Sequence, residues 1–147
     1  MKQKIINACL YLLDEKIAAF KRSADELGKD AENDSKSSAG DKHETARAMM
    51  QIEQEKLYKQ LNEVMEQKLE LEKCRHIVTT DRAGKGSLVK TNLGTFFICI
   101  PLGKINLNEQ MVYIVSPQSP LGIKFAGAKK GDAVQINEAL YSISDIE

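Results

Sequence analysis

The first half of the chain carries apolar residues at alternating steps of four and three. Toward the N-terminus these positions are Ile6, Leu10, Leu13, Ile17, Phe20, Ala24 and Leu27. The same spacing resumes at Met50, Leu57, Leu61, Val64 and Leu71, with polar Gln54 and Lys68 filling the two missing positions. This spacing is typical of helices that pack along a partner helix. Joined by a short polar turn, the segments predict an antiparallel hairpin of helices over residues 4–34 and 42–74.

The second half of the chain has a different pattern. Residues 84–147 contain all three prolines and seven of the nine glycines. Between these turn residues lie short β-branched and aromatic runs, which predict strands over residues 87–91, 95–100, 111–115, 133–136 and 140–146. Ser119 as N-cap and Pro120 at the first helical position predict a short helix over residues 121–126. We therefore expect a small antiparallel sheet packed by one short helix.

These patterns predict an α+β fold with a change of architecture near residue 76. We expect a coiled-coil hairpin with an acidic tip over residues 1–76, a polar linker over 77–86, and a sheet domain over 87–147. At 147 residues and 42% hydrophobic content the chain can bury one modest core.

Charge and cysteine usage exclude several classes of protein. The formal net charge is zero, so no overall field attracts DNA, and we expect no sequence-specific DNA binding. No apolar run is long enough to span a membrane. Cys9, Cys74 and Cys99 are far apart and lack metal-ligand spacing. They are therefore expected to be reduced thiols, which predicts a cytoplasmic protein.

The predicted turn of the hairpin is acidic. Residues 25–44 contain seven acids and three lysines, a net charge of −4. Asp41 and Glu44 lie one helical turn apart at the start of the second helix, a spacing that fits a capping box. The same spacing lets both carboxylates face outward and share a divalent cation, completed by ligands from a partner or by phosphates. The residues alone leave both interpretations open.

Three motifs along the chain resemble those of a known family. They are Gly40-Asp41-Lys42-His43-Glu44-Thr45-Ala46, Gly86-Ser87-Leu88-Val89, and Ser119-Pro120-Leu121-Gly122 followed by Gly127 and Lys130-Gly131-Asp132. In order and separation they are similar to motifs of the bacterial Gre transcript-cleavage factors. The resemblance covers essentially the whole chain. It implies an N-terminal coiled-coil hairpin and an FKBP-like C-terminal domain.

The resemblance also implies a function. The hairpin would enter the secondary channel of RNA polymerase, where Asp41 and Glu44 would help to hold a catalytic Mg²⁺ that promotes cleavage of backtracked RNA. The protein would thus be an accessory factor and not an enzyme itself, a monomer that binds Mg²⁺ only together with polymerase and holds no other cofactor. It would contact nascent RNA only indirectly and no membrane. Ser119, Pro120, Leu121 and Gly122 would contribute to partner binding.

The sequence departs from the family at the tip and leaves alternatives. Thr45 stands where the family has Asn, and Arg47-Ala48 stands where it has Glu-Tyr. A divergent regulator that binds polymerase without stimulating cleavage is one alternative, and a plain coiled-coil interaction protein is another. An FKBP-like domain also raises prolyl-isomerase activity, which needs an aromatic-lined pocket. The aromatic content of 5% can be used up entirely in the core.

Overall fold

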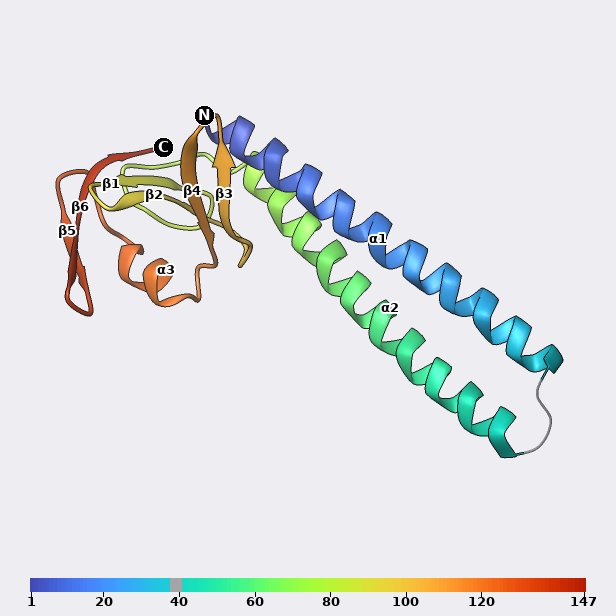
Figure 1. The fold of residues 1–147 in the computed structure, drawn as a ribbon. Coiled ribbons are helices and arrows are strands. Elements are labelled where there is room, and N and C mark those ends of the chain that lie inside the picture. The colour runs from blue at the N-terminus through green and yellow to red at the C-terminus, as the bar shows by residue number, and fades with distance from the viewer. Residues whose placement is uncertain (38–40) are drawn as a thin grey trace. The chain divides into compact units, whose positions relative to one another are not determined.

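The computed structural model describes the backbone of residues 1–37 and 41–147, and the side chains of residues 1–30 and 44–147. Two long helices come first, and a sheet with one short helix follows (Figure 1). In chain order the elements are α1 (Lys2–Ser37), α2 (Asp41–Arg75), β1 (Leu88–Thr91), β2 (Gly94–Ile98), β3 (Gly103–Leu107), β4 (Gln110–Val115), α3 (Pro120–Phe125), β5 (Ala133–Ile136) and β6 (Ala139–Ile146). The predicted α+β class is confirmed.

The chain forms two compact units. One unit is residues 11–68, and the other combines residues 1–10 with residues 69–147. The first turns of α1 and the last turns of α2 therefore belong to the same unit as the sheet. The predicted boundaries, a hairpin over 1–76 and a linker over 77–86, concern independent folding rather than packing, and they stay a prediction.

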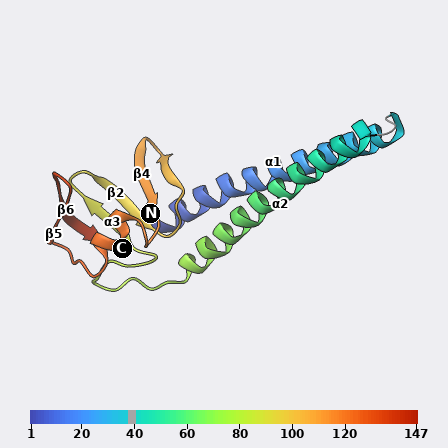
Figure 2. The same ribbon diagram turned by 90° about the horizontal axis from the view of Figure 1, so that it is seen from below.

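The helices α1 and α2 run side by side in opposite directions (Figures 1 and 2). Every residue of the 4-3 pattern, from Ile6 to Leu27 and from Met50 to Leu71, is buried or half-buried. Tyr58 and Met65 lie outside this pattern, and they are 51% and 45% exposed. The 4-3 spacing therefore identified the packed face correctly. The helices extend beyond the predicted limits by one to three residues at each end.

The two polar residues in the 4-3 pattern of α2, Gln54 and Lys68, each lie beside a particular residue of α1. Lys68 reaches sideways and forms an ion pair with Asp14 of α1 at 2.7 Å between Nζ and Oδ1. Gln54 lies opposite Gly28, where an added Cβ would make an ordinary van der Waals contact with the Gln54 Nε2 atom at 3.8 Å. A glycine in the middle of a helix is unfavourable by itself, and the packing of the Gln54 amide does not require one here.

The sheet has six strands in the order β3-β4-β2-β1-β6-β5. Adjacent strands are antiparallel except β2 and β4, which pair in parallel with Phe97 opposite Ile114. The expectation of about five purely antiparallel strands is therefore corrected by one additional strand and one parallel pair. The additional strand is β3, a short edge strand in which only Ile105 is buried.

The turn between β3 and β4 explains this arrangement. Asn108 and Glu109 form a two-residue loop, and both have positive φ, at 51° and 66°. Such a turn closes a tight hairpin whose twist matches the strands. The hairpin joins the sheet through β4, which leaves β3 at the edge and places β4 parallel to β2.

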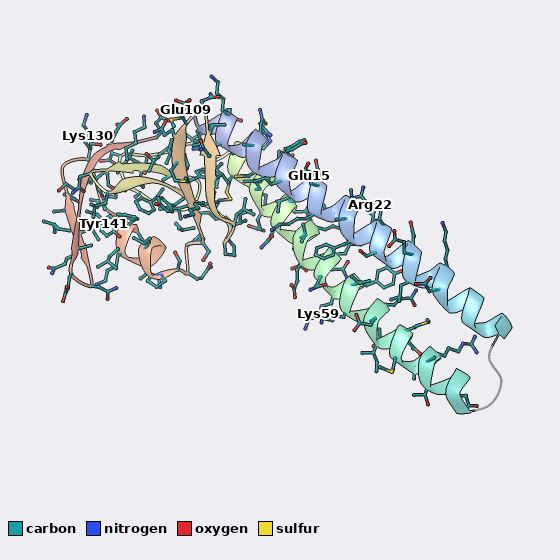
Figure 3. All side chains as sticks on the ribbon, in the orientation of Figure 1. Glu15, Arg22, Lys59, Glu109, Lys130 and Tyr141 are labelled. Carbon is teal, nitrogen blue, oxygen red and sulfur yellow. A yellow bond between two sulfur atoms is a disulfide. The ribbon has the colours of Figure 1, made fainter. Side chains whose placement is uncertain are left out.

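One face of the sheet packs against α3. Its core contains Ala83, Val89, Phe96, Ile98, Phe125, Ala128 and Ile143, all buried. The Phe96 ring stacks on Tyr113 with centroids 5.2 Å apart. Tyr141, labelled in Figure 3, meets Phe96 and Phe125 edge-on at 5.7 and 5.8 Å. These offset and edge contacts are favourable aromatic geometries. The aromatic side chains are thus packed against one another.

The opposite face carries Phe97 and Cys99, because successive strand residues alternate between faces. Cys99 forms a disulfide with Cys74 in the last turn of α2, with Cα atoms 6.8 Å apart. This bond places the end of α2 on that face, and the fully buried side chains of Ile5, Ile6 and Leu71 belong to the same unit.

The disulfide corrects the prediction of three reduced thiols. Cys74 and Cys99 are 25 residues apart in sequence, and only the packing of α2 on the sheet brings them together. Cys9 stays a free thiol, as predicted. It is fully buried, and desolvation raises the pKa of its thiol to about 12.

Candidate functional site

The candidate tip lies where the second helix begins. Asp41 is the first residue of α2, and Glu44 follows one turn later with an exposed side chain. The side chain of Asp41 lies outside the described residues, so its place in a capping box or a metal site stays a prediction. The backbone of Asp41 lies in the first turn of α2, at the positive end of the helix dipole.

The length of the helices determines how far the tip can be carried. Helix α1 has 36 residues and α2 has 35. At 1.5 Å per residue these helices are about 54 and 52 Å long. Arg22 on α1 and Lys59 on α2, labelled in Figure 3, are exposed, as expected of the outer faces of a two-helix rod. The two helices are thus long enough to carry their shared end about 50 Å from the opposite end of the hairpin.

The opposite end of the hairpin is fastened by polar contacts within the sheet-containing unit. The Arg75 guanidinium donates to the side-chain oxygens of Gln3 and Asn7, each at 2.8 Å. Lys2 donates to the Thr79 hydroxyl at 2.7 Å. Burial lowers the pKa of Lys2 because its ammonium is partly removed from water.

Glu70 adds a second group of contacts on the same part of α2. Its carboxylate accepts from Lys85, beyond the end of the helix, and from Lys73 at 3.0 Å. These hydrogen bonds, the one from Lys85 being the larger cause, lower the pKa of Glu70. All of these groups are substantially exposed, so each pair adds little stability by itself.

The predicted partner-binding segment forms the start of α3. Ser119 is the N-cap, as predicted: its hydroxyl accepts from the Gly122 N–H at 3.0 Å and donates to the Ser116 carbonyl at 2.6 Å. Pro120 is exposed at the first helical position, and Leu121 packs half-buried against the core. Gly122 is buried, and a Cβ there would lie 2.1 Å from the Ser116 carbonyl oxygen. Three of the four residues thus have contacts inside the domain, and partner binding by this segment stays a prediction.

The turn that carries Lys129 and Lys130 borders a groove of about 360 Å³. Asp81 and Asp145 line the same groove, and Lys129 approaches Asp81 at 3.9 Å. The two positive and two negative side chains offset each other. The groove therefore favours neither an anion nor a cation.

No protein-family model matches this sequence, and no curated protein matches it. Within the described residues, no helix is long and apolar enough to cross a membrane. No cluster of three or more histidine, cysteine, aspartate or glutamate side chains suited to a metal ion is found among those same residues.

The sequence patterns did not predict that Cys74 and Cys99 form a bonded pair. A usable signal was present, because Cys74 lies at the end of a predicted helix and Cys99 lies near the end of a predicted strand. Two cysteines at element ends are brought together whenever the helix ends on the sheet beside that strand. The spacing in sequence alone gives no information about that meeting.

Proposed function

We propose that this protein is a transcription elongation factor of the Gre type, which binds RNA polymerase through its secondary channel in the cytoplasm and stimulates cleavage of backtracked RNA. One observation carries the proposal. Two antiparallel helices of 36 and 35 residues follow each other directly along the chain, and the second helix opens with the acid pair Asp41 and Glu44. The sequence motifs that resemble the Gre factors lie at the start of this second helix and in the sheet domain.

The geometry fits the task of bringing two carboxylates to a remote catalytic centre. A rod of about 50 Å crosses a deep channel that a globular domain cannot enter. Asp41 and Glu44 would act as oxygen ligands one helical turn apart, a ligand type that suits Mg²⁺. Other oxygen ligands would have to come from the polymerase and the RNA, and Mg²⁺ held in this way would supply Lewis-acid activation of a water for cleavage of the phosphodiester. The hairpin residues position the ligands and perform no bond-breaking themselves.

Helix capping is the competing account of the same two residues. A cap-only role predicts that Asp41 and Glu44 matter for stability alone, at about 1 kcal/mol. Substitution by Asn and Gln distinguishes the two accounts, because the amides keep the size of the side chains and part of their capping capacity. The amides lose the negative charge that a magnesium ion requires.

The decisive assay adds the protein to stalled, backtracked elongation complexes that carry RNA labelled at the 5′ end. The wild type should shorten the RNA from its 3′ end in the presence of Mg²⁺. The double substitution Asp41→Asn and Glu44→Gln should abolish shortening while competition for polymerase binding persists. The matched control is Asp25→Asn with Glu26→Gln, an exposed acid pair on α1 that should leave cleavage unchanged. Cleavage that survives the tip substitution refutes the catalytic assignment.

The changed tip sequence favours a second candidate. Arg47 is exposed one turn beyond Glu44 and reverses the charge of the family's usual residue there. A positive side chain beside the acids weakens their attraction for a cation. A divergent factor that occupies the channel without cleavage is therefore the second candidate. It predicts that the wild type competes for polymerase yet leaves the RNA uncut, and that Arg47→Glu with Ala48→Tyr gains cleavage.

A further inference from the structure

The disulfide between Cys74 and Cys99 is the strongest chemical feature that the proposed function does not use. Both residues are buried, at 0% and 4% exposure. Cys74 lies in the last turn of α2, one residue before its end, and Cys99 directly follows β2. The bond therefore ties a helix end, the part of a helix most prone to fraying, to the centre of a sheet.

The other contacts of this helix end are weak individually. The side chains of the pairs Lys73–Glu70 and Arg75–Glu72 are exposed by between 27% and 68%. These ion pairs also lie within α2 and do not hold it to the sheet. Glu70 with Lys85 is the ion pair that links α2 to the segment before β1. The disulfide is a covalent link between α2 and the sheet, so shielding by salt does not weaken it as it weakens this exposed ion pair.

The segment that follows α2 leaves the end of this helix free to unwind, which would expose the disulfide. Residues 77–80 have no regular secondary structure, and Val78 is 87% exposed. A thiol reagent reaches the buried sulfurs once the last turn of α2 unwinds. This unwinding breaks the hydrogen bonds of Arg75 to Gln3 and Asn7, which are exposed to water and therefore contribute little, and it uncovers the Cys74 side chain. A disulfide at such a place is open to exchange in the folded protein.

We propose that Cys74 and Cys99 form a reversible redox site that locks the last two turns of α2 onto the sheet when oxidised and releases them when reduced. The reductant is a low-molecular-weight thiol such as glutathione. One glutathione thiolate attacks a protein sulfur, forms a mixed disulfide and expels the other cysteine as a thiolate, which takes up a proton. A second glutathione thiolate attacks the mixed disulfide, so two protein thiols and one glutathione disulfide result. Two electrons pass to the cystine, and the reverse sequence closes the lock.

This inference goes beyond the proposed function and does not depend on it. The lock concerns how α2 is held within its own unit, so it can be measured without polymerase. Cys9 provides a matched control, because it is buried in the same unit and has no disulfide partner.

The test incubates the folded full-length protein in glutathione buffers of varied reduced-to-oxidised ratio, then traps thiols by alkylation and follows amide hydrogen exchange. The wild type should pass from one to three alkylated thiols under denaturing quench as the ratio rises. Exchange at residues 70–76 should accelerate roughly thirtyfold or more on reduction, the factor that loss of a cross-link of this span implies. Exchange in β5, at the edge of the sheet two strands beyond β1, should stay unchanged.

Variants separate the lock from a general loss of stability. Cys99→Ser should show rapid exchange at residues 70–76 in both oxidised and reduced buffer, whereas Cys9→Ser should respond to glutathione as the wild type does. Resistance of the wild-type bond to every glutathione ratio in the folded state would overturn reversibility. Equal exchange in the oxidised and reduced protein would overturn the lock.

Discussion

Replacing Gly122 with alanine should destabilise the sheet domain strongly, although it adds a single methyl group. The Cβ of alanine would lie 2.1 Å from the Ser116 carbonyl oxygen and 3.0 Å from two backbone atoms of Pro117. Backbone atoms cannot rotate away as a side chain does. Either the segment before α3 shifts by about 1 Å, or α3 lifts from the core that contains Phe125.

The magnitude follows from what this shift disrupts. Overpacking of a well-packed core costs about 2 kcal/mol. The Ser116 carbonyl also accepts from the Ser119 hydroxyl at 2.6 Å and from the Ser119 N–H at 3.1 Å, and loss of one such bond adds about 1 kcal/mol. The free energy of unfolding should therefore fall by about 3 kcal/mol, which lowers the Tm of a domain of this size by about 12 °C or more.

Differential scanning calorimetry and near-ultraviolet circular dichroism of the tyrosines measure this loss. The matched control is Gly84→Ala, because a Cβ at Gly84 would have no atom within 4 Å. That control should change stability by less than about 0.5 kcal/mol. If Gly122→Ala costs less than about 1 kcal/mol, or if the two variants behave alike, then the close approach of Ser116 to α3 does not govern packing as described.

Two further predictions concern a turn and a buried thiol. Glu109→Gly should raise the free energy of unfolding by about 0.5–1 kcal/mol, because glycine adopts the φ of 66° in the β3–β4 turn without the steric penalty that glutamate has there. Urea denaturation measures this change, and no gain or a loss of stability would contradict this interpretation of the turn. Cys9 should make stability fall as pH rises between 9 and 12, because its thiol stays protonated in the folded state up to a pKa of about 12 whereas the unfolded thiol ionises near 9.0. Comparing the pH slope of the unfolding free energy with that of Cys9→Ala isolates this contribution, and an unchanged slope would show that Cys9 is not desolvated.

The sequence patterns predicted the elements whose signal is local. The 4-3 spacing identified the packed faces of α1 and α2, since its residues from Ile6 to Leu27 and from Met50 to Leu71 are all buried or half-buried. Ser119 and Pro120 marked the start of α3 because capping depends on residues within one turn. In both cases the cause of the structure lies within a few residues of its effect.

The missed features depend on contacts between distant segments. Strand β3 alternates polar Lys104 and Asn106 with apolar neighbours, and as an edge strand it buries only Ile105. Its residue pattern therefore resembles that of a loop. The parallel pairing of β2 with β4 follows from how a hairpin inserts into a sheet, which no local pattern encodes. The disulfide needs the end of α2 and the end of β2 to meet. Whether Asp41 and Glu44 hold a metal stays a prediction, because the side chain of Asp41 lies outside the described residues.

The central claim, that the hairpin tip reaches the catalytic centre of RNA polymerase, is tested most directly by a chelate tethered near the tip. Arg47→Cys creates an exposed thiol, while Cys9, Cys74 and Cys99 are all buried, so an iron chelate attaches selectively and the two candidate acids stay intact. Lys59→Cys, about 18 Å farther along α2, is the matched control. Hydroxyl radicals from the chelate at position 47 should cut the polymerase beside its catalytic metal ions, and those from position 59 should cut the channel wall instead. Cuts confined to the outer surface of the polymerase, or none at either position, would contradict the account.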